Sequence, residues 1–287
     1  MNMPLLNPID PAYLTDDHSK KITLAHSYFE SIGVDQFKEG ELDPNIQDSD
    51  GLVSYMVATS NPVPDEISKL YDEIAPIMEG LSNVVVSAIL KQAGTDTEKK
   101  HDPATWRGPM QAMMKAFCSG FSETSKSYNQ KVKGVEIANK FINIVLDAIV
   151  SEGAALNDFR KFLESQGETM RTEISAGANT YLYANVAIAH EIFQATDGRW
   201  IYVPKFKSYF TQFTQETFKI TAGCASYDSF DFNFDLDIMT GAFMVNNWSS
   251  SEDFRKRTKE FIDRFQKANI ADSSNYFDGI FESEGGF

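Results

Sequence analysis

The sequence has few of the residues from which catalytic and metal sites are built. It contains two cysteines, Cys118 and Cys224, and four histidines among 287 residues. The cysteines lie far apart and lack the C-x-x-C spacing of zinc and thiol-redox sites, so we predict neither a disulfide framework nor a metal centre. Basic residues are also scarce, with 26 Lys and Arg against 41 Asp and Glu. The resulting net charge of −15 disfavours nucleic acid as a partner and weakens electrostatic adsorption to anionic lipid.

Long hydrophobic runs are absent as well. The first ten residues hold neither the basic region nor the apolar stretch of a secretory signal. The longest apolar windows, around Val84–Leu90 and Phe141–Val150, contain polar interruptions and fall short of the roughly 20 residues that a spanning helix needs. We therefore expect a soluble chain, whose affinity for a membrane would have to come from apolar surface or from an acyl chain.

The first half of the chain has apolar residues at helical spacing. This pattern predicts helices over 64–94, over 102–121, over 132–150 and over 155–164. Pro76 is expected to kink the first of these helices or to split it. The second helix would carry Cys118 on an apolar face rich in methionine, where a buried thiol acts as a small hydrophobe. A short β-prone segment, 52–60, precedes them.

The hydrophobic period changes near Thr180. A long strand over 180–193, a Thr196-Asp197-Gly198 turn and a return strand from Trp200 predict a hairpin. Pro204 places the middle of the return strand at an edge, a bulge or a break. Strict alternation over 227–238 predicts a half-buried strand with a Phe face inside and four polar residues facing solvent: Asp231, Asn233, Asp235 and Asp237.

A closing helix over 250–267 follows the strands. Helices, then an antiparallel sheet, then a helix indicate an α+β fold and not alternating βα units. We predict an irregular N-terminal arm over residues 1–20, one domain over 21–268 and a flexible acidic tail over 269–287.

The known catalytic motifs are missing. His190-Glu191 begins like H-E-x-x-H, but residue 194 is Gln, and no G-x-S-x-G, P-loop or dinucleotide fingerprint is present. We therefore predict no catalytic residues, and the cofactor-binding residues stay unknown. Cys224 stands between Gly223 and Ala225, which leaves two interpretations open: a small residue where backbones approach, or a thiol that carries an acyl chain.

The runs YLYANVAIAHEIF, ATDGRWIYVPKF, FTQETFKITAG and YDSFDFNFDLDI resemble the sheet region of the Cyt-type insecticidal cytolysins. In length, and in a Gly-Cys within the sheet, the chain is more similar to the enterobacterial virulence factor Evf of the same fold group. The resemblance covers roughly residues 60–265, mainly as element order. It implies a single three-layer α/β/α cytolysin-like domain, with an antiparallel sheet flanked by helices.

The resemblance also implies function. We expect a toxin-like virulence protein that is secreted or released from its bacterium without a conventional signal peptide and acts on host membrane lipids, where it can form oligomers. The Evf-like branch implies a covalently bound palmitate, which we assign to Cys224 and not to Cys118. We expect no other cofactor and no enzyme activity. Two alternatives remain: a carrier of free fatty acid, and an enzyme in which Cys224 or Cys118 is the nucleophile and His190 the base.

Overall fold

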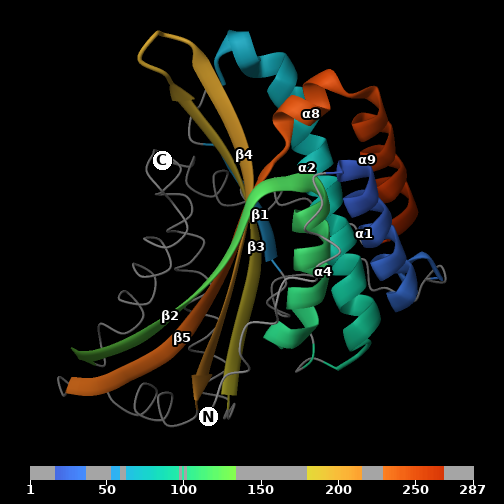
Figure 1. Cartoon of the computed structure of the whole chain (residues 1–287). Helices are drawn as coiled ribbons and strands as arrows, with labels where there is room; N and C mark the ends of the chain where they lie inside the picture. Colours follow the sequence, from blue (N-terminus) through green and yellow to red (C-terminus); the bar gives the residue numbers. More distant parts are fainter. Residues whose placement is uncertain are drawn as a thin grey trace, which may run out of the picture.

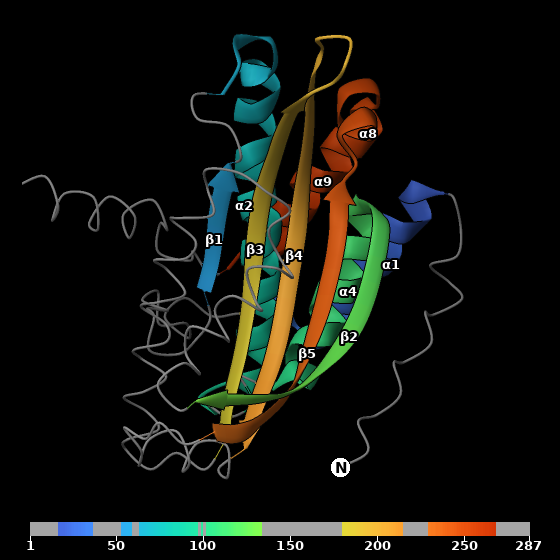
Figure 2. The ribbon, with the colours of Figure 1, turned by 90° about the vertical axis from the view of Figure 1, so that its left-hand side faces the viewer.

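The computed structural model describes residues 17–36, 53–58, 63–96, 99, 102–133, 180–214 and 229–267. In these ranges a five-stranded sheet packs on one face against a layer of helices (Figure 1). The strand order is β1-β3-β4-β5-β2, and Figure 2 shows the strands side by side. The predicted α+β class is therefore confirmed.

Four strands of the sheet are antiparallel. They are β2 (Cys118–Lys133), β3 (Thr180–Gln194), β4 (Trp200–Thr214) and β5 (Ser229–Phe243). The short β1 (Val53–Ala58) departs from the expected pattern, because it pairs in parallel with β3 at the edge of the sheet. The start of β5 and the end of β2 bend away from the helices (Figure 1).

The hairpin between β3 and β4 is confirmed. The backbone N–H of Ala195 donates to the Arg199 carbonyl at 2.8 Å, and Gly198 has a φ of +85°, which glycine adopts without strain. Pro204 lies opposite His190 of β3, one residue before β4 begins to pair with β5 at Lys205. The proline therefore occupies a local edge of a central strand, one of the three positions that the sequence predicts.

The helix layer consists of α1 (His18–Ile32), the 3-10 turn η2 (Val34–Gln36), α2 (Asp65–Ala93), α4 (Pro103–Phe117), α8 (Val245–Ser250) and α9 (Glu252–Phe265). Side-chain caps set three of the starts, because Asp17, Asp102 and Ser251 each accept a hydrogen bond from a first-turn backbone N–H. Helix α1 begins inside the predicted arm of residues 1–20.

Helix α2 is the centre of the helix layer. All residues from Gly80 to Leu90 are buried, so the helix is covered around its whole circumference there. The helix runs through Pro76 without splitting. By length and composition it qualifies as a membrane-spanning helix, which corrects the sequence analysis; polar residues such as Asn83 and Ser87 interrupt the apolar run but not the helix. Because 72% of its most apolar 18-residue window is buried inside the protein, it is equally a core helix.

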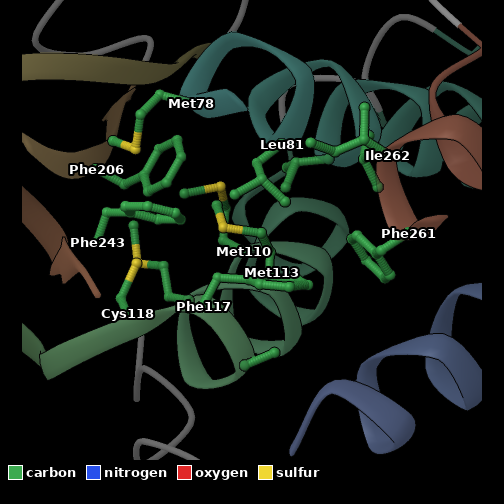
Figure 3. Close-up of a cluster of buried hydrophobic side chains, with 14 of the residues drawn as sticks. Met78, Leu81, Met110, Met113, Phe117, Cys118, Phe206, Phe243, Phe261 and Ile262 are labelled. Carbon is green, nitrogen blue, oxygen red and sulfur yellow. The ribbon is translucent and has the colours of Figure 1, made fainter. Parts of the chain in front are cut away.

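The core lies between α2, α4, α9 and the sheet (Figure 3). Met110 and Met113 of α4 point toward Phe206 and Phe243 on the helix-facing side of the sheet, and Phe261 of α9 approaches from the other side. Methionine side chains adapt to such irregular spaces between aromatic rings. The methionine-rich helix is therefore a core element.

The second predicted helix ends earlier than expected. Helix α4 stops at Phe117, and β2 begins at Cys118, so Cys118 and Phe121 lie on a strand. The apolar spacing continues across this boundary, but Gly120 has a φ of +63° and β2 pairs with β5 over most of its length. Long-range strand pairing thus overrides a local helical pattern.

Several predictions fall outside the described residues. These are the arm up to residue 16, most of the helix over 132–150, the helix over 155–164, Cys224 and the tail. Val132 and Lys133, which the sequence analysis assigned to the start of a helix, belong to β2 instead. The domain boundaries therefore stay predictions.

Gly80 allows α9 to approach α2, and its substitution tests this packing. A Cβ atom at residue 80 would lie 2.8 Å from Cγ2 of Ile262, closer than side chains tolerate. We expect Gly80→Ala to lower the free energy of unfolding by about 1–3 kcal/mol despite the better helix propensity of alanine. Urea unfolding measures the change. In an Ile262→Ala background the same substitution should cost less or stabilise, and an equal cost in both backgrounds would contradict the contact.

Candidate functional site

Cys118 is sealed into the core. Cys118 is 6% exposed and lies against Met114 and Gly241. A Cβ atom added at Gly241 would lie 2.9 Å from the Cβ of Cys118. Figure 3 shows Cys118 beside Phe117 and Phe243. Burial raises the pKa of the thiol far above its usual value. Because the thiolate is the reactive form, Cys118 is an inert thiol in this conformation.

Cys118 and His190 do not form a catalytic pair. Cys118 begins β2 and His190 lies on β3, and the strands β4 and β5 separate them in the sheet. Three strand spacings correspond to roughly 14 Å, far beyond hydrogen-bond reach. The sequence-based alternative that uses Cys118 as nucleophile and His190 as base is therefore wrong. The pair of Cys224 and His190 stays untested, because Cys224 lies outside the described residues.

His190 is a structural histidine at the junction of β3, β4 and α2. Its Nδ1 lies 2.6 Å from the Tyr202 hydroxyl oxygen, and its ring lies 4.8 Å from that of Tyr71 on α2, centroid to centroid. Burial lowers the pKa of His190 to about 4 and raises the pKa of Tyr202. Both groups are therefore neutral near pH 7, as expected for a hydrogen-bonded pair in an apolar layer.

A polar cluster joins α4 to the sheet. The Arg107 guanidinium donates to Glu123 of β2 at 2.8 Å and to Asp237 of β5 at 3.0 Å. Gln111 lies one turn further along α4 and donates to the other Glu123 oxygen at 2.7 Å, while Lys115 donates to Gln111 at 3.2 Å. One arginine thus holds two carboxylates of neighbouring strands beneath the helix.

Asp237 corrects the sequence analysis. The predicted solvent-facing residue is 8% exposed and faces α4, on the same side of β5 as Met239 and Phe243. Arg107 compensates the burial of its charge. The side chains of Asp231, Asn233 and Asp235 lie outside the described residues.

The Arg107 cluster was not predicted from the sequence. A signal for it was present, because Arg107, Gln111 and Lys115 recur every fourth residue on a helix whose other face is apolar. Such a stripe indicates one polar side of the helix but does not identify acidic partners on distant strands. Within the described ranges no group of three or more His, Cys, Asp or Glu residues is placed to hold a metal ion.

The buried state of His190 predicts a pH-dependent stability. Since the pKa is lowered to about 4 in the folded state, the unfolded chain binds the proton first as the pH falls below about 6.5. The free energy of unfolding should therefore decrease by about 2 kcal/mol between pH 7.5 and pH 5 through this residue. Urea unfolding at both pH values measures it. His190→Gln should remove most of the decrease, and an unchanged pH dependence would contradict the assignment.

The Arg107 cluster predicts a large effect of one substitution. Arg107→Met leaves two largely buried carboxylates without their guanidinium, so we expect a loss of about 3 kcal/mol in the free energy of unfolding. Arg257→Met is the matched control, because Arg257 pairs with Asp253 at 2.8 Å on the exposed face of α9 and should cost less than about 1 kcal/mol. Equal losses in the two variants would show that the cluster contributes no more than a surface ion pair.

Comparison with solved structures gives a relative of similar extent. The structure described as the Evf virulence factor is 26% identical, with 87% of this chain and 92% of that chain covered and a TM-score of 0.65. A delta-endotoxin is 14% identical over 81% of this chain and 94% of its own, with a TM-score of 0.37. Activated Cyt2Ba from Bacillus thuringiensis subsp. israelensis is 11% identical over 67% of this chain and 97% of its own, with a TM-score of 0.29.

The sequence comparisons agree with the structural relative. A search of curated protein sequences gives no match. The sequence model of the family described as "Virulence factor Evf" matches residues 45–281, which is most of the chain and includes Cys224. The predicted resemblance is thus confirmed, and this chain belongs to the Evf virulence factor family.

Proposed function

We propose that this virulence-family protein acts at host membranes by contact with lipid and not by catalysis, and that a palmitoyl thioester on Cys224 anchors it there. Family membership supports the role in virulence. The membrane step fits the composition, because a chain of net charge −15 gains little from anionic headgroups and needs apolar area or an acyl chain. The proposal includes release from the bacterium and allows oligomers on the membrane.

The burial of Cys118 is the observation that carries the choice of residue. An acyl chain on the Cys118 sulfur would have to displace Met114, Phe117 or Phe243, which fill the core around this side chain. A packed interior has no space for such a group without a large loss of stability. Of the two cysteines in the chain, Cys224 is therefore the one that we assign to acylation.

The state of His190 supports a non-enzymatic role. A general base works best with a pKa near the ambient pH, whereas burial lowers the pKa of His190 to about 4. Its Nδ1 is engaged by Tyr202, and Cys118 is both distant and protonated. These contacts make His190 a packing residue between α2 and the sheet.

Intact-mass measurement tests the acyl group. We expect the protein purified from a bacterium to carry an adduct of acyl-chain size, and hydroxylamine to remove it, because hydroxylamine cleaves thioesters. Cys224→Ser should lose the adduct completely, while Cys118→Ala should retain it. An unmodified mass for the wild-type chain would reject the acyl anchor. Fatty acid that is extractable from such an unmodified chain would identify a carrier instead.

A further inference from the structure

Two apolar side chains at the tip of the β3–β4 hairpin are exposed. Phe193 and Ile201, which we call the tip pair, are partners across the two strands. They are 48% and 36% exposed, and within the described part of the chain they are the large hydrophobic residues that solvent reaches most. Paired exposure at one site is unlike the scattered apolar residues of ordinary surfaces.

The tip pair points away from the helix layer. The next residues along each strand, Ile192 and Tyr202, are buried in the core, and side chains of successive strand residues alternate between the faces. Phe193 and Ile201 therefore lie on the other face of the sheet. The hairpin and the first turns of α2 together form one end of the molecule (Figures 1 and 2). A flat surface that approaches this end meets the hairpin and the start of α2 before it meets α1 or α9.

The hairpin does not share the negative net charge of the chain as a whole. Residues 190–207 contain three bases and two acids, a net charge of +1 with His190 neutral, in a chain of net charge −15. Arg199 pairs with Asp197 at 2.7 Å, and Lys207 pairs with Glu191 at 3.0 Å. Lys205 also contacts Glu191.

The carboxylate of Glu191 stays charged near neutral pH. Burial favours the protonated form of Glu191, but hydrogen bonds and charge from Lys205 and Lys207 outweigh burial and lower its pKa. The hairpin therefore presents paired charges around an apolar centre and does not repel an anionic surface as the net charge of the whole chain would.

We propose that the tip pair is the surface through which the folded chain first contacts a lipid bilayer, with both side chains entering the headgroup region. The inference rests on the proposed membrane function and adds a contact site separate from any acyl group. A hydrophobic pair with neighbouring cations suits the bilayer interface, which accepts apolar side chains at its surface. A bilayer is favoured over a protein partner because two exposed side chains with balanced charge around them offer far less area than a stable protein interface buries.

Trp200 provides a natural reporter of this contact. It lies next to Ile201 at the hairpin, on the opposite face of the strand, where it packs only partly against the core. Trp106 and Trp248, the other two tryptophans, are 0% and 3% exposed. Lipids brominated near the headgroup quench tryptophans that come close to them. With vesicles of equal parts phosphatidylcholine and brominated phosphatidylglycerol, we expect quenching of the wild-type chain and its near-complete loss in Trp200→Phe.

Substitution of the tip pair tests the same contact by affinity. The double variant Phe193→Ser with Ile201→Ser should weaken vesicle binding of the hydroxylamine-treated chain by about tenfold. In the wild-type chain the exposed part of these two side chains leaves water on binding, and the variant lacks this apolar area. Asp197→Asn with Arg199→Gln is the matched control at the same tip and should leave binding within about twofold. Both double variants change exposed residues, and their thermal unfolding confirms that they are folded.

The outcomes separate this inference from the proposed function. Flotation of the wild-type chain without quenching of Trp200 overturns the tip contact but leaves membrane action standing. Flotation that the Phe193/Ile201 double variant retains at full strength after hydroxylamine treatment also overturns it. A wild-type chain that neither floats nor is quenched, with or without its acyl group, rejects both. Light scattering that finds a dimer which the double variant dissociates would assign the tip pair to self-association instead.

Discussion

The complete burial of the middle of α2 is the constraint on which the rest of the described structure depends. From Gly80 to Leu90 the helix has no side facing water, so the sheet must cover one face while α1, α4 and α9 cover the others. The absence of a side chain at Gly80 lets α9 pack closely against α2. The Ser87 hydroxyl donates to the Asn83 carbonyl within α2 and accepts from the backbone N–H of Lys267. The amphipathic outer helices follow from this arrangement, because each must bury one apolar stripe against α2 or α4.

The chain's non-apolar contacts hold the helix layer and the sheet in one position. Arg107 joins α4 to β2 and β5, and the hydrogen bond of His190 with Tyr202 lies under Tyr71 of α2. In both places a polar group is buried only because a specific partner meets it. Cys118 and His190 are therefore committed to structure. Among the described residues, the two exposed large hydrophobic side chains lie at the hairpin between β3 and β4.

Local signals in the sequence predicted much of this architecture. The turn at Gly198, the helix start at Asp102 and the strand β5 are each encoded within about ten residues and are confirmed. β2 was missed because its polar sequence gains its strand state from pairing with β5, whose partner residues lie 96 to 125 positions further along the chain. Asp237 was assigned to the wrong environment for a related reason, since the alternation shows that two faces differ but not which face carries a buried arginine.

The central claim is that this acidic virulence-family chain binds lipid through apolar contact. Vesicle flotation at low and high salt tests it most directly, because salt screens attraction between charges but leaves apolar burial intact. The account predicts that the purified chain floats with vesicles of phosphatidylcholine and phosphatidylglycerol, and that the bound fraction at 1 M salt is at least that at low salt, where a net charge of −15 opposes binding. A chain that stays at the bottom of the gradient, or that leaves the vesicles as salt is added, would contradict the account.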